Sequence, residues 1–75
     1  MGFDKDALRN AAVHLRNWQL HGGDNFHSLL FHLISKAYRA YNYYALNRGF
    51  PYEVAVYDEW CNSDTPEEFY RKYGL

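Results

Sequence analysis

The histidines are the residues of this sequence that most readily suggest a ligand site. All four lie within the first 32 residues, and His21 and His27 flank a Gly-Gly pair together with Asp24. Imidazole and carboxylate groups form a donor set that suits zinc or nickel. The spacing is poor, because His27 and His32 are five residues apart and do not share a helix face. We expect Asp24 to cap a helix. No metal or cofactor is predicted, and His21, Asp24 and His27 are kept as an alternative metal site.

Nucleophilic catalysis has less support from the residues. Cys61 is the single cysteine, and its acidic neighbours Asp58 and Glu59 would disfavour a thiolate. We therefore expect Cys61 to be a buried packing residue. The Gly22-Gly23 pair lacks the preceding strand and the lysine of a phosphate-binding loop. The sequence predicts no catalytic residues and a protein that is not an enzyme.

A segment rich in tyrosine and basic residues is the basis for a nucleic-acid alternative. Tyrosine rings can stack on bases while basic side chains contact phosphates, and the residues concerned are Lys36, Arg39, Arg48 and Tyr43. The net charge is −1, with 8 Lys and Arg against 9 Asp and Glu. So few cations disfavour strong phosphate binding. Tyrosine and arginine are also favoured at protein interfaces, which is the preferred interpretation.

Apolar periodicity and capping signals predict an all-α fold in a single domain, residues 1–75. Breaks at Gly22-Gly23 and at Gly49-Phe50-Pro51 separate the helices, and Thr65-Pro66-Glu67-Glu68 forms a capping box. No strand is predicted. The expected elements are three main helices and a short C-terminal fourth, at residues 4–21, 24–49, 51–61 and 66–73.

The second of these helices is expected to be long and central, with the others packed around the stretch from Phe26 to Leu46. Gly49 would end it in the left-handed conformation. Its length of roughly 34 Å exceeds the diameter of about 29 Å expected for the domain. A second copy could cover the overhang, or the helix could break near its tyrosine-rich end; we expect the first. Its buried face is predicted to hold Phe26, Leu29, Leu30, Leu33, Ala37, Tyr41 and Tyr44, flanked by His27, Phe31 and Tyr38.

Several apolar and aromatic side chains fall outside the predicted buried faces. A lone molecule gains little from such residues, whereas a protein interface uses them. We therefore expect a non-enzymatic protein-interaction module that self-associates, as a homodimer. The predicted interface residues are Val13, Leu20, Tyr38, Arg39, Tyr43 and Leu46.

The composition limits where the protein is expected to work. The sequence contains no uncharged apolar stretch near 18 residues, so no membrane-spanning segment is predicted. The start, MGFDKDALRN, has no apolar run typical of a signal peptide. A lone cysteine gives no sign of an oxidising compartment. A cytoplasmic location is expected.

Part of the sequence resembles a known group of proteins. The stretch HGGDNFHSLLFHLISKA, followed by NRGFPYEV, EW and TPEEFY, is similar to small helical proteins encoded in bacterial and phage genomes. The resemblance covers about residues 21–70. It implies a small helical protein of phage origin, with no assigned activity, cofactor or catalytic residue. The chain departs from this pattern at Tyr38 to Tyr44, where more charge is expected.

Overall fold

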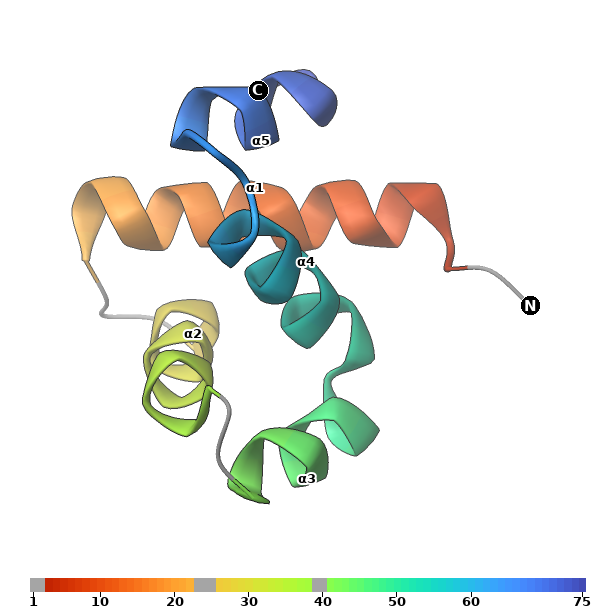
Figure 1. Cartoon of the computed structure of the whole chain (residues 1–75), viewed down its shortest axis with the longest axis vertical. Helices are drawn as coiled ribbons and strands as arrows, with labels where there is room; N and C mark the ends of the chain where they lie inside the picture. Colours follow the sequence, from red (N-terminus) through yellow and green to blue (C-terminus); the bar gives the residue numbers. More distant parts are fainter. Residues whose placement is uncertain (1–2, 23–25, 39–40) are drawn as a thin grey trace.

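The computed structural model describes residues 3–22, 26–38 and 41–75, and it is all-α across them (Figure 1). The fold class is therefore confirmed. The predicted helix count is wrong, because the expected second helix is divided in two. The described residues form five helices: α1 (Lys5–His21), α2 (Phe26–Ala37), α3 (Tyr41–Gly49), α4 (Pro51–Cys61) and α5 (Pro66–Lys72).

Local signals set most of the helix ends. The Asp4 side chain accepts a hydrogen bond from the Asp6 N–H at 2.9 Å and caps α1. The Thr65 side chain accepts from the Glu68 N–H at 3.3 Å and caps α5, which is the Thr65 half of the predicted capping box. Gly22 has a φ of 71° and donates its N–H to the Trp18 carbonyl, which ends α1. Glycine adopts this left-handed conformation without the Cβ penalty.

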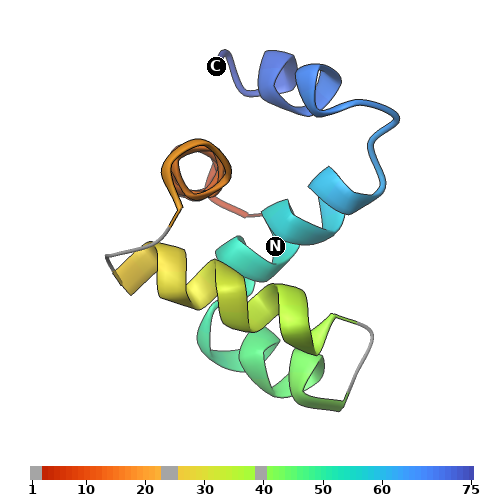
Figure 2. The ribbon, with the colours of Figure 1, turned by 90° about the vertical axis from the view of Figure 1, so that its left-hand side faces the viewer.

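Helix α4 is the central element. It packs against each of α1, α2, α3 and α5. In both ribbon views α5 lies towards one end of the molecule and α3 towards the other, with α1 and α4 crossing between them (Figures 1 and 2). The side chains of Val54, Val56 and Tyr57 on α4 are buried. The expectation that the stretch from Phe26 to Leu46 organises the fold is therefore wrong.

The predicted long helix ends early. Helix α2 stops at Ala37, Tyr38 lies in a turn, and α3 begins at Tyr41. The Cα extents of 33 × 31 × 23 Å mean that an unbroken rod of roughly 34 Å would reach across the whole molecule. The bend instead lets α2 and α3 both pack on α4. The overhang expected to need a second copy is thus removed within one chain.

The end of α3 also differs from expectation. Gly49 is the last residue of α3 and is helical, and α4 follows after Phe50 alone. Of the glycines that the structure describes, only Gly22 and Gly74 have positive φ. The predicted left-handed stop at Gly49 is wrong, and the direction of the chain changes at Phe50, which has φ −136° and ψ 62°.

Helix α2 is rotated about its axis relative to the predicted orientation. Phe31, which was expected on the flank, is fully buried, and its ring stacks at 6.1 Å from that of Trp18. Leu30 and Ala37 are buried as predicted, but Phe26, Leu29 and Leu33 are 62%, 58% and 55% exposed. The prediction of a buried face is therefore wrong for these three, and the side chains of Tyr41 and Tyr44 lie outside the described residues. The three exposed side chains belong to a helix that is apolar on more than one face, so the packing partners decided which face turned inward.

The rotation of α2 predicts a large loss of stability for one phenylalanine variant and a small loss for another. Phe31→Ala should lower the free energy of unfolding by about 3–5 kcal/mol, or prevent folding, because it empties a fully buried site. Phe26→Ala should cost only about 1 kcal/mol, because most of that side chain is exposed, although its ring lies 6.1 Å from that of Phe50. Urea unfolding of both variants measures the difference. A larger loss for Phe26→Ala would contradict this orientation.

Candidate functional site

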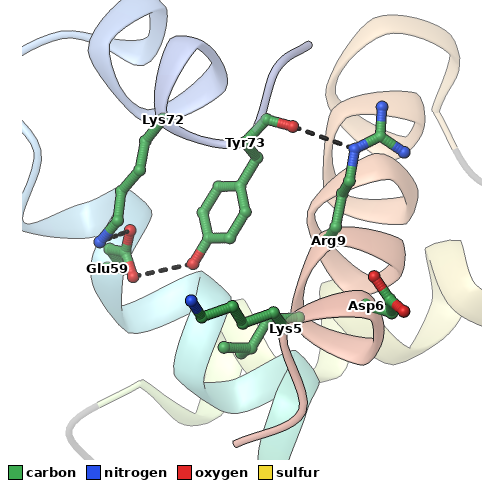
Figure 3. Close-up of a pocket in the computed structure, with 7 residues that line it drawn as sticks. Lys5, Asp6, Arg9, Glu59, Lys72 and Tyr73 are labelled. Atoms are coloured by element: carbon green, nitrogen blue, oxygen red, sulfur yellow. Dashed lines mark hydrogen bonds and ion pairs between the residues drawn. The ribbon is translucent and has the colours of Figure 1, made fainter.

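A cleft lies where α1, α4 and α5 meet (Figure 3). It has a volume of about 500 Å³, which is the size of a small-molecule site. The ends of three helices bring both basic and acidic side chains to it. The lining residues are Lys5, Asp6, Leu8, Arg9, Glu59, Lys72 and Tyr73.

Most polar groups of this cleft bind one another. Arg9 Nε donates to the Tyr73 carbonyl at 3.1 Å, and the Tyr73 hydroxyl donates to Glu59 Oε2 at 3.0 Å (Figure 3). Lys72 Nζ forms an ion pair with Glu59 Oε1 at 2.8 Å. The Arg9 cation also lies just past the C-terminus of α5, where the helix dipole favours positive charge. These contacts attach α5 to α1 and α4, so the cleft acts as a structural clamp.

Tyr73 in the cleft and Tyr57 on α4 keep their hydroxyl protons. Burial raises the pKa of Tyr73 to about 12, and the hydrogen bond to the Glu59 carboxylate acts in the same direction. Burial also raises the pKa of Tyr57 to about 12, helped by the neighbouring Cys61. Both hydroxyls are therefore neutral donors at physiological pH. This state suits structural hydrogen bonds and does not suit a general base or nucleophile.

The predicted chemical sites are only partly described. His21 is exposed at the end of α1, whereas Asp24 and the His27 side chain lie outside the described residues. Among the residues that the structure does place, no three His, Cys, Asp or Glu side chains form a metal-holding group. The His21, Asp24 and His27 metal site stays a prediction. Cys61 is exposed, so the expectation of a buried packing cysteine is wrong.

Three of the predicted interface residues pack inward. Tyr38, Tyr43 and Leu46 are half-buried against the core. The Tyr38 ring lies edge-on to Tyr43 at 5.4 Å, and the Tyr43 hydroxyl donates to the Val54 carbonyl at 3.4 Å. The bend after Ala37 turns these rings towards α4. The premise that they stay outside a lone molecule is therefore wrong, and their role in an interface stays a prediction.

The other predicted interface residues have mixed surroundings. Leu20 is 60% exposed near the end of α1, whereas Arg39 lies outside the described residues. Val13 is half-buried between Arg9, which binds the Tyr73 carbonyl, and Arg16, whose guanidinium lies 5.8 Å from the Tyr70 ring centroid. Helix α5 therefore approaches the side of α1 that was expected to be open.

The residues of the nucleic-acid alternative are only partly described, because Arg39 lies outside the described residues. Lys36 and Arg48 are exposed on α2 and α3. The Tyr43 ring, which was expected to stack on bases, instead packs against the core. This arrangement gives the alternative no stacking platform from Tyr43. Nucleic-acid binding stays an untested prediction.

The outward face of α2 is the surface that sequence reasoning missed. Phe26, Leu29 and Leu33 recur at three- and four-residue steps, and each is more than half exposed. We call these three residues the α2 stripe. They expose on the order of 300 Å² of apolar surface, in the size range of functional patches. The available signal was the excess of apolar residues in the 12-residue helix: Phe26, Leu29, Leu30, Phe31, Leu33, Ile34 and Ala37.

Comparisons with known proteins add no relatives. The chain matches no family model, no curated protein and no solved structure. The resemblance to small helical proteins of bacterial and phage genomes therefore stays a prediction. Within the described part of the chain, no helix is both long enough and apolar enough to cross a bilayer.

The raised tyrosine pKa values predict a loss of stability at alkaline pH. Unfolding returns the pKa of each of Tyr57 and Tyr73 from about 12 to its ordinary value of 10.0. The unfolded state therefore releases protons that the folded state retains, so the free energy of unfolding should fall as pH rises from about 10 to about 12. Urea unfolding at several pH values measures the slope. Tyr73→Phe should flatten it, and an unchanged slope in that variant would contradict the assignment.

Proposed function

We propose that this protein is a small, non-enzymatic interaction module that self-associates through the α2 stripe. The observation that supports the proposal is the exposure of Phe26, Leu29 and Leu33, at 62%, 58% and 55%, on one face of one helix. A cytoplasmic location belongs to the proposal, because the lone cysteine gives no sign of an oxidising compartment.

The stripe differs from ordinary surface exposure. Single apolar side chains on a surface are common and need no explanation. Here three large ones follow one another along one helix face, and the adjoining side of the same helix is fixed by the buried Phe31 and Ile34. The stripe is therefore held in place by the core. Apolar surface removed from water contributes about 25 cal/mol per Å², which favours covering it with a partner.

The size of the stripe predicts a weak complex. Two copies in contact would remove on the order of 600 Å² of apolar surface, and about 1,000 Å² in total if the usual polar rim is included. This total lies at the lower limit for specific interfaces. We expect a reversible dimer with a Kd on the order of tens of micromolar.

Sedimentation velocity at about 10 and about 500 µM tests the proposal across the expected Kd. The wild-type sedimentation coefficient should rise with concentration. Leu33→Glu should abolish the rise while leaving the thermal midpoint nearly unchanged, because Leu33 is 55% exposed and a carboxylate cannot be buried without a large cost.

The matched control is Phe3→Glu, which introduces the same carboxylate outside the stripe. Phe3 is 49% exposed and precedes α1, about 25 Å along that helix from the α2 end. This variant should associate like wild type. A wild-type chain that stays monomeric at about 500 µM would rule out self-association through the stripe.

A further inference from the structure

We infer that the two copies pair through antiparallel α2 helices, with a two-fold axis close to Leu29. This inference rests on the proposed function and specifies the geometry of its contact. A two-fold contact uses the same patch on both copies, so the patch must be complementary to itself. The α2 stripe meets this condition better when the two helices run antiparallel than when they run parallel, for reasons of shape and of charge.

The shape argument comes from the spacing of the three side chains. The midpoint between Phe26 and Leu33 falls next to Leu29. An antiparallel pair therefore places Phe26 opposite Leu33 of the partner copy, and Leu29 opposite its own counterpart. The bulky ring meets the smaller side chain at both ends, which allows the layers to interdigitate. A parallel pair would instead oppose the two phenylalanines directly at one end.

The charge argument comes from Lys36. It is exposed and lies three residues beyond Leu33, so it continues the stripe along the same helix face. The sequence from residue 26 to residue 50 contains no Asp or Glu to neutralise it. Antiparallel pairing about Leu29 separates the two Lys36 positions by roughly 20 Å, beyond the screening length of about 8 Å. Parallel pairing would place them side by side.

The helix dipoles favour the same direction. Each α2 carries partial positive charge at its N-terminus and partial negative charge at its C-terminus. Antiparallel pairing sets opposite ends beside each other, and parallel pairing sets like ends together. Shape, side-chain charge and dipole therefore all favour one orientation of the second copy.

Disulfide trapping tests this geometry. The exposed Cys61 is first changed by Cys61→Ser, so that each variant carries one thiol. Under mild oxidation at a concentration that supports the dimer, Leu29→Cys should link to itself. The Phe26→Cys protein and the Leu33→Cys protein should each link poorly alone. A mixture of the two should form the disulfide between residue 26 of one copy and residue 33 of the other, because a disulfide needs Cα atoms about 4.4–6.8 Å apart and only the antiparallel pair brings these two positions together.

The control is Leu20→Cys, which is 60% exposed on α1 and should give only collisional linking. Efficient self-linking of both Phe26→Cys and Leu33→Cys would overturn the antiparallel geometry in favour of a parallel one. Dimerisation in sedimentation without any stripe disulfide would also overturn it, while leaving self-association intact. A monomer in sedimentation would instead remove the proposed function itself.

Discussion

The burial of α4 by the other helices is the interaction on which the rest of the structure depends. Tyr57 is its centre: the ring lies 6.5 Å from that of Trp18 on α1, 5.5 Å from that of Tyr38 after α2, and 5.8 Å from that of Trp60. Small domains bury little apolar surface, so large rings provide much of the core. The sequence supplies 8 Tyr, 5 Phe and 2 Trp for this purpose.

The same requirement explains both the bend after Ala37 and the exposed stripe. Helices α2 and α3 must both reach α4, and a straight helix would let only part of the segment do so. Packing Phe31 against Trp18 then fixes the rotation of α2. Because α2 has more apolar residues than one face can hold, this rotation leaves the α2 stripe outside. The core of the monomer thus determines which surface is available for a partner.

Features coded by nearby residues could be predicted from the sequence. The cap at Thr65, the stop at Gly22 and the start of α4 at Pro51 each depend on residues within one turn. A break near the tyrosine-rich end was only the less favoured alternative, because residues 38–40 contain no glycine or proline to mark it, whereas the packing of both α2 and α3 on α4 joins segments far apart in the sequence. The orientation of α2 was ambiguous for a similar reason. Periodicity identifies apolar faces, but it does not say which face the core selects. The sequence does contain a signal for the central position of α4, because its apolar residues Val54, Val56 and Tyr57 lie on two sides of the helix.

Native-state amide hydrogen exchange tests most directly the claim that α4, and no long rod, organises the fold. The slowest exchange should occur in α4, around Val54 to Tyr57, with opening free energies that approach the global free energy of unfolding. Protection should fall at Tyr38, which follows the end of α2. Continuous strong protection from Phe26 to Leu46, together with weaker protection in α4, would contradict the account.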